Sequence, residues 1–158
     1  MPRTPDESKY RISALFQDRL KFLIDEQDLT KKDFAAAAGV NKEIIIRATV
    51  YGIVPSVKSL IKLANYLQCP IFYLLGESDD NDFIPSTEDK TFFDRLQALT
   101  TEKGIKYSAL SHSMSFASNS VYEWIRTNSL PSLEYLIELA EFFSVTVDYL
   151  LGRTDYRN

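Results

Sequence analysis

The sequence predicts an all-α protein in which one small unit of five helices occurs twice. When the chain is shifted by 76 positions, residues 16–79 align without a gap on residues 92–155, and 17 of the 64 aligned pairs are identical. A repeat of this length indicates two copies of one structural unit. Apolar residues recur within each copy at steps of three and four, which is typical of amphipathic helices. No segment has the alternating pattern of a strand.

An apolar stripe and two end signals predict the first two helices of the first copy. The stripe consists of Phe16, Leu20, Leu23 and Ile24. Thr30 is a good N-cap for a short alanine-rich helix over 31–38. Gly39 follows it and tolerates the positive φ that ends many helices.

Capping residues also mark the remaining three helices of this copy. Asn41 is expected to cap a third helix that runs to about Val50. After a loop, Ser56 caps a fourth helix, and Pro70 opens a fifth that ends at Gly76.

The second copy repeats this plan from about Phe92, but its end signals are weaker. Lys106 and Ala117 stand where the first copy has Thr30 and Asn41, and neither is a preferred N-cap. We therefore expect a third helix over 117–126 with less certain limits.

Composition points to a soluble, cytoplasmic protein. No segment approaches the roughly 20 apolar residues of a membrane helix, and the first ten residues lack the apolar core of a secretory signal. The single Cys69 cannot form an internal disulfide. The formal charge of −4 argues against a broadly basic protein but leaves room for a local basic patch.

The second and third helices of each copy form a helix-turn-helix candidate, with Gly39 or Ser115 in the turn. The first copy reads LTKKDFAAAAGV, then PSVKSLIKLANYL and YLLG; the second reads NSVYEW, then PSLEYLIELAEFF and VTVDYLLGRTD. Over nearly the whole of each repeat, these segments resemble the Cro/CI-type (XRE, lambda-repressor-like) DNA-binding family, most closely in the second copy. The resemblance implies two tandem five-helix lambda-repressor-like DNA-binding domains.

The expected organisation is a first domain over 1–76 with a short N-terminal tail, an acidic linker over 77–90, and a second domain over 91–158. About 14 extended residues reach roughly 45 to 50 Å. This exceeds the roughly 34 Å between successive major-groove faces of a duplex. Both domains could therefore bind one DNA molecule on the same side.

Helical geometry, at 100° per residue, separates the outward from the inward residues of each third helix. The expected inward residues are Asn41, Ile44, Ile45 and Ala48 in the first copy, and Ala117, Ser120, Val121 and Trp124 in the second. The expected outward residues are Lys42, Glu43, Ile46, Arg47 and Val50 in the first, and Ser118, Asn119, Tyr122, Glu123 and Arg126 in the second. Asn, Arg, Lys, Ser and Glu are side chains that read base edges.

The resemblance assigns DNA contacts to particular positions. Lys42, Glu43, Arg47, Ser118, Asn119 and Glu123 match the base-contacting positions of the family. The outward geometry adds Tyr122 and Arg126 to the expected base-facing residues, and the expected phosphate contacts are Lys31, Lys32 and Tyr107. At Lys31 and Tyr107 the family usually has a glutamine that touches the backbone. The family's glutamate-x-glycine at the end of this helix is also replaced, by Thr49 and Tyr51 or by Ile125 and Thr127.

These observations predict a sequence-specific transcriptional regulator that acts on double-stranded DNA, as a repressor by operator occupancy. The net charge over 29–56 is +2 and that over 105–132 is +1, so each unit should bind weakly alone, because phosphate neutralisation sets most nonspecific affinity. Useful affinity would need both units on one site or a homodimer. No small-molecule ligand, cofactor, metal, membrane or catalytic residue is expected.

The alternative is a protein-interaction or dimerisation module in which one or both copies no longer bind DNA. Ile46 leaves this open, because an isoleucine in the reading face could contact a thymine methyl or could mark a surface for protein contact.

Overall fold

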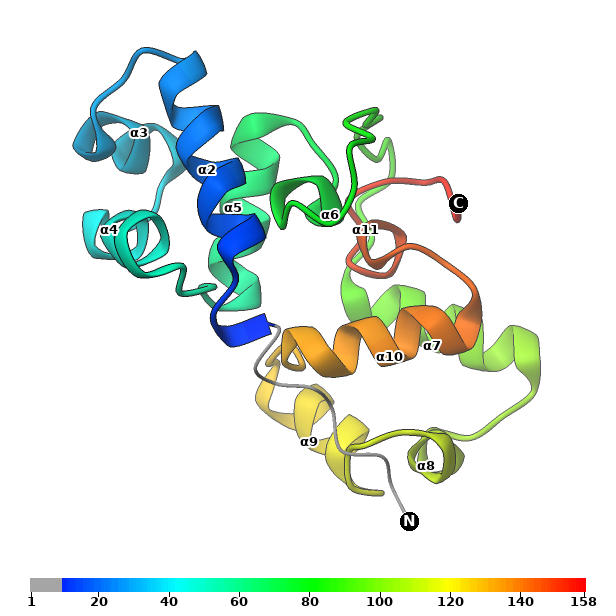
Figure 1. The fold of residues 1–158 in the computed structure, drawn as a ribbon. Helices are drawn as coiled ribbons and strands as arrows, with labels where there is room; N and C mark the ends of the chain where they lie inside the picture. Colours follow the sequence, from blue (N-terminus) through cyan, green and yellow to red (C-terminus); the bar gives the residue numbers. More distant parts are fainter. Residues whose placement is uncertain (1–9) are drawn as a thin grey trace. The chain divides into compact units, whose positions relative to one another are not determined.

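The computed structural model describes residues 10–158, which divide into two compact units, up to Phe83 and from Ile84 onward. Each unit is described by itself. Between residues 14 and 83 the first unit has five helices (Figure 1): α2 (Ala14–Glu26), α3 (Lys31–Ala38), α4 (Lys42–Tyr51), α5 (Val57–Leu67) and α6 (Ile71–Leu74). The all-α prediction is confirmed for the described residues, where the sole extended pairing is an isolated bridge between Ile12 and Ile53.

The helices of the first unit begin and end where the capping residues predicted. The Thr30 hydroxyl accepts a 3.1 Å hydrogen bond from the Asp33 amide, and Gly39 ends α3 with φ of 78°. Asn41 is the N-cap residue of α4, although its side chain makes no capping bond there. α2 packs against α4 and α6, while α3 packs against α4 and α5.

The second unit has five α-helices and one short 3₁₀ helix between residues 92 and 158. These are α7 (Phe92–Lys103), α8 (Tyr107–Leu110), η1 (Ser111–Ser113), α9 (Ser120–Thr127), α10 (Leu133–Phe143) and α11 (Val147–Leu150). The expected third helix over 117–126 was placed too early, because α9 begins at Ser120. Ser118 and Asn119 therefore lie in a turn before the helix.

Long-range contacts explain why the second unit departs from the pattern of the first. Ser115 stands where the first unit has a glycine, and Glu138 of α10 accepts bonds from its amide (3.1 Å) and its hydroxyl (2.6 Å). Phe116 is buried and packs edge-on against Trp124 and Tyr135, with ring centres 5.1 and 5.5 Å away. These contacts fix the turn. They also bury Glu138, of which only 5% is accessible.

The two units share a clamp that joins the first helix to the segment after the last helix. Its equivalent members are Arg19, Tyr73 and Asp79 in the first unit and Arg95, Tyr149 and Asp155 in the second. Each guanidinium lies over the tyrosine ring, at 4.0 Å in the first unit and 4.2 Å in the second, and each bonds its aspartate at 3.1 Å. All six residues belong to identical pairs of the repeat.

A glycine completes the same junction in each unit. Gly76 has φ of +75°, and a Cβ atom there would lie 2.5 Å from the backbone oxygen of Leu15 at the start of α2. Gly152 has φ of +76°, and a Cβ atom there would lie even closer to the backbone oxygen of Lys90. Only glycine fits this conformation and this approach together, which accounts for the identity at this position of the repeat.

Much of the predicted linker over 77–90 bonds to the units themselves. Arg19 donates to the Ser78 carbonyl at 3.2 Å. On the other side, the Ser86 hydroxyl donates to Asp155 at 2.5 Å and the Ser86 amide to the Arg153 carbonyl at 2.8 Å. The segment between the clamped Asp79 and Ser86 is therefore six residues long, Asp80–Pro85. It reaches roughly 20 Å when extended, which corrects the 45 to 50 Å expected from 14 free residues.

Among the described residues, no helix is both long enough and apolar enough to span a membrane.

Candidate nucleic-acid interface

α4 presents a charged outer face and buries an apolar inner face. Ile45, Ala48 and Thr49 are buried, while Lys42, Glu43, Arg47 and Val50 are exposed. The expected outward positions are thus confirmed as solvent-facing, apart from the half-buried Ile46. The expectation that Asn41 points inward was wrong, because this N-cap residue is exposed.

α4 is held at its C-terminal end by a side chain from α2. The Gln17 side-chain amide donates to the carbonyls of Thr49 (2.9 Å) and Val50 (3.1 Å). These carbonyls belong to the last turn of the helix, where no helical N–H reaches them. Gln17 therefore fixes the direction of α4. Sequence reasoning missed it, because its partners lie more than 30 residues away.

The segment before α2 also pairs with the loop that follows α4. The Ser13 amide donates to the Gly52 carbonyl and the Val54 amide to the Arg11 carbonyl, both at 2.8 Å. The second unit has a different arrangement here. The residue equivalent to Arg11 is Thr87, and it bonds to Asp155 instead.

Two lysines occupy the first turn of α3. Lys31 and Lys32 are exposed and are the first two residues of the helix. A cation at a helix N-terminus opposes the macrodipole and costs about 0.3 to 1 kcal/mol. An anion bound beside the two lysines would offset their unfavourable interaction with the helix dipole. Their placement therefore favours contact with a negatively charged ligand.

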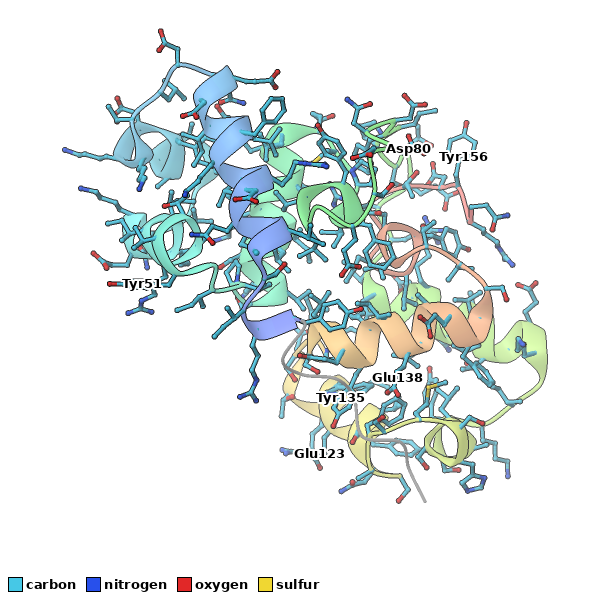
Figure 2. All side chains as sticks on the ribbon, viewed as in Figure 1. Tyr51, Asp80, Glu123, Tyr135, Glu138 and Tyr156 are labelled. Carbon is cyan, nitrogen blue, oxygen red and sulfur yellow. The ribbon has the colours of Figure 1, made fainter. Side chains whose placement is uncertain are left out.

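An apolar edge adjoins the charged face of α4 at its C-terminal end. Val50, Tyr51 and Ile53 are exposed to 49%, 65% and 37%, and Figure 2 shows Tyr51 at this end of the helix. The family pattern expected a glutamate and a glycine around this point. The first unit therefore has exposed apolar side chains beside the cations of α4.

α9 of the second unit has a different surface. Only Val121 of α9 is buried, and α9 has no extensive contact with α7 of the kind that α4 makes with α2. Tyr122, Glu123 and Arg126 are exposed, and Figure 2 labels Glu123 on α9. Arg126 bonds Glu123 at 2.6 Å, which lowers the pKa of the Glu123 carboxyl and raises that of Arg126.

Tyr107, an expected phosphate contact, lies at the start of α8 against α9. Its ring is edge-on to Tyr122 with centres 5.9 Å apart. Burial raises the pKa of the Tyr107 phenol above its usual value. The hydroxyl therefore keeps its proton at neutral pH and can donate it to an anionic oxygen.

The helical part of the first unit differs in charge from the second unit. Residues 10–76 carry nine basic and six acidic side chains, for a net charge of +3. The four acidic residues between 77 and 83 bring the first unit as a whole, residues 10–83, to a net charge of −1. Residues 84–158 carry seven basic and ten acidic side chains, for a net charge of −3. Because the cations of α3 and α4 belong to the positively charged residues 10–76, we expect the stronger attraction for a polyanion there.

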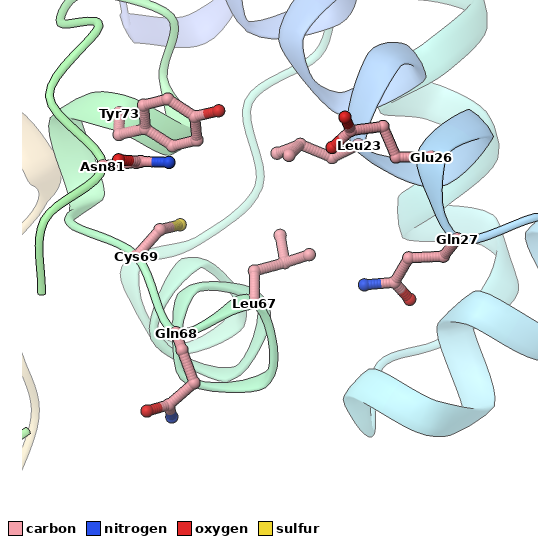
Figure 3. A pocket seen from close by; sticks show the side chains of 8 residues that line it. All are labelled: Leu23, Glu26, Gln27, Leu67, Gln68, Cys69, Tyr73 and Asn81. Atoms are coloured by element: carbon pink, nitrogen blue, oxygen red, sulfur yellow. The ribbon is translucent and has the colours of Figure 1, made fainter.

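A small pocket of about 200 Å³ lies elsewhere in the first unit (Figure 3). Its lining residues are Leu23, Glu26, Gln27, Leu67, Gln68, Cys69, Tyr73 and Asn81. None of them belongs to α3 or α4, so the pocket is separate from the charged face. Within residues 10–158, no group of three or more histidine, cysteine, aspartate or glutamate side chains is arranged to hold a metal.

Comparison with known protein families locates a match in the first unit. Residues 20–74 match the Helix-turn-helix family of XRE type, which is a DNA-binding family. The sequence analysis placed the closer resemblance in the second copy, which this family match does not include. No curated protein and no solved structure matches the chain. The match spans α3 and α4 with the helices that support them, and it indicates a DNA-binding transcription regulator of the XRE type.

Proposed function

We propose that this protein is a sequence-specific DNA-binding regulator of transcription that acts by occupying an operator. The observation that carries the proposal is the row of exposed cations on α3 and α4, within the segment that matches the helix-turn-helix family. α4 enters the major groove, and α3 lies over the adjacent phosphates.

The side chains of α4 suit base reading. Lys42 and Arg47 donate to the O6 and N7 acceptors of guanine, and Glu43 accepts from the N4 amino group of cytosine. Lys31 and Lys32 donate to phosphate oxygens, which fixes register without reading sequence. Gln17 keeps α4 in position for both sets of contacts.

The second unit adds a second surface to the same function. Ser118, Asn119, Tyr122, Glu123 and Arg126 face bases, and Tyr107 donates to phosphate. The proposed place of action is the cytoplasm of a bacterial or phage-infected cell, as a repressor, with a homodimer as one way to raise affinity further.

A salt titration with matched variants tests this function. The full chain is mixed with a pool of genomic DNA fragments, and retention is measured from low to high salt. Lys31→Ala/Lys32→Ala should reduce the slope of log K against log salt by about 2, because each lost phosphate contact removes roughly 0.9. Lys42→Ala/Arg47→Ala should weaken binding to the best fragment at least tenfold.

The control is Lys58→Ala/Lys62→Ala, which removes the same charge from exposed positions on α5 of the same unit. It should change affinity much less than either test variant. If all three variants weakened binding equally, the binding would be explained by nonspecific attraction between charges. If no DNA were retained at low salt, the proposed function would be refuted.

A further inference from the structure

The identities between the two copies are unevenly distributed. Of the 17 identical pairs, six lie within residues 16–26 and eleven within 55–79, when numbered in the first copy. None lies within residues 27–54, the segment that contains α3, the turn and α4. Nearly half of the positions in the supporting stretches are therefore identical, 17 of 36, whereas the reading segment, residues 27–54, differs at every position.

Several of the identical residues make the same contacts in both units. The clamp contacts and the junction glycine recur in both, with closely similar distances and dihedral angles. The supporting framework has thus been preserved, so divergence of the reading segment is not a general loss of structure.

The reading segment has been rebuilt inside as well as outside. The small Ala38 and Ala48 of the first unit are replaced by Met114 and Trp124. Trp124 packs on Phe116. α9 starts two residues later than α4, its counterpart in the first unit. The two helices therefore cannot present equivalent positions to a base pair.

The exposed groups also differ in chemistry. On α4, Lys42 and Arg47 are solvent-exposed donors suited to guanine. On α9, the Arg126 guanidinium is engaged by Glu123, which leaves Asn119 and Tyr122 as the prominent neutral groups nearby. An asparagine pairs with adenine, and a tyrosine ring can contact a thymine methyl.

We propose that the chain binds an asymmetric DNA target composed of two unlike half-sites, one read by α4 and the other by α9 with the turn before it. This rests on the proposed DNA-binding function and specifies its target. The first unit supplies most of the salt-dependent affinity because α3 and α4 carry four exposed cations, Lys31, Lys32, Lys42 and Arg47. The second contributes discrimination, and its short connection of six residues raises its effective concentration at the adjacent half-site.

Selection of bound sequences from a random duplex pool tests the proposal with the full chain. The wild-type protein should select two different motifs at a defined spacing. Lys42→Ala/Arg47→Ala should erase sequence preference in one motif, and Asn119→Ala/Tyr122→Ala should erase it in the other. The second variant should lower affinity for the selected site about tenfold and leave the salt slope unchanged.

Two further variants keep the result interpretable. Asn119→Asp replaces an amide that can donate by a carboxylate that only accepts, so it should alter the same motif. Aspartate is also a good N-cap residue, so the start of α9 should be retained. Glu141→Ala, at an exposed position on α10, should leave both motifs unchanged.

Two results would overturn the proposal: a palindrome or a repeat of identical half-sites, or one motif unaffected by the Asn119 and Tyr122 variants. The latter would assign the α9 surface to a protein partner. Failure to select any DNA sequence would instead refute the proposed function itself.

Discussion

The same aspartate occupies very different surroundings in the two units. Asp79 is fully exposed and bonds Arg19, whereas the side chain of Asp155 is 29% exposed. Asp155 accepts bonds from the Ser86 hydroxyl, the Thr87 amide and hydroxyl, and Arg95. These bonds, with that of Ser86 the largest contribution, hold the pKa of the Asp155 carboxyl far below its usual range.

This depressed pKa predicts a pH-dependent contribution to stability. A carboxyl group with a lower pKa in the folded state stabilises the fold above its unfolded pKa of about 4, and the contribution is lost on acidification through the folded pKa. Asp155→Asn should therefore lower the melting temperature at pH 7, and its difference from wild type should shrink below about pH 4.

Thermal unfolding between pH 2 and 7 measures this difference, with Asp79→Asn as the equivalent substitution in the first unit. The control should change stability little, because an exposed ion pair contributes about 0 to 1 kcal/mol. A melting-temperature difference for Asp155→Asn that stays constant down to pH 2 would contradict the assignment.

Individual residues show what the sequence can and cannot predict. Thr30 and Gly39 act through neighbours three or four positions away, so their roles at helix ends were predictable from local sequence. The burial of Glu138 was not predictable in this way, because it depends on Ser115, which lies 23 positions away. A carboxylate on a helix is usually solvated, and the tertiary contact overrides that expectation.

At the scale of elements, the position of α4 depends on its contact with α2. Gln17 provides two donors to the end of α4, and the helix has three buried residues as its inner face. α9 lacks such a contact, because the residue equivalent to Gln17 is Phe93. The two reading helices are thus supported in different ways.

Gln17→Glu should disturb the first unit by changing this one contact. The variant keeps the shape of the side chain, but it places a carboxylate against two carbonyl oxygens at the negative end of a helix dipole. We expect a loss of about 1 to 3 kcal/mol in the free energy of unfolding, together with weaker DNA binding.

Urea unfolding and fragment retention measure the two effects, and Gln97→Glu on the exposed face of α7 is the matched control. That substitution should change stability by less than about 0.5 kcal/mol. If the two variants behaved alike, Gln17 would have no specific role in positioning α4.

The sequence predicted α3 and α4 more accurately than α8 and α9 for a physical reason. In the first unit, the Thr30 side chain caps the start of α3 and Gly39 ends that helix at the turn, and both signals are local. In the second unit, the contacts of Phe116 and Trp124 with α10 define it, together with the Glu138 bonds. Such contacts require the fold to be known. The predicted surface of α4 consequently fits the structure, whereas Ser118 and Asn119 lie outside the helix assigned to them.

For the molecule as a whole, the charge and the connection determine how the two units act together. Residues 10–76, which include Lys31, Lys32 and Arg47, carry a net charge of +3, and residues 84–158 carry −3. The second unit should therefore bind DNA only when the first unit holds it nearby. Its binding is then an intramolecular step, whose strength is set by the effective concentration that the connecting segment provides.

An insertion of ten glycine and serine residues between Asp82 and Phe83 should alter this step without changing either reading helix. It lengthens the connecting segment from six to sixteen residues. The effective concentration falls with roughly the −3/2 power of length, so affinity for the wild-type spacing should fall about fourfold. A longer, flexible segment should also let the selected half-sites occur at several spacings instead of one. Adding the same ten residues after Asn158 should change neither affinity nor spacing. If the internal insertion were equally without effect, the two units would not be acting together on one DNA molecule.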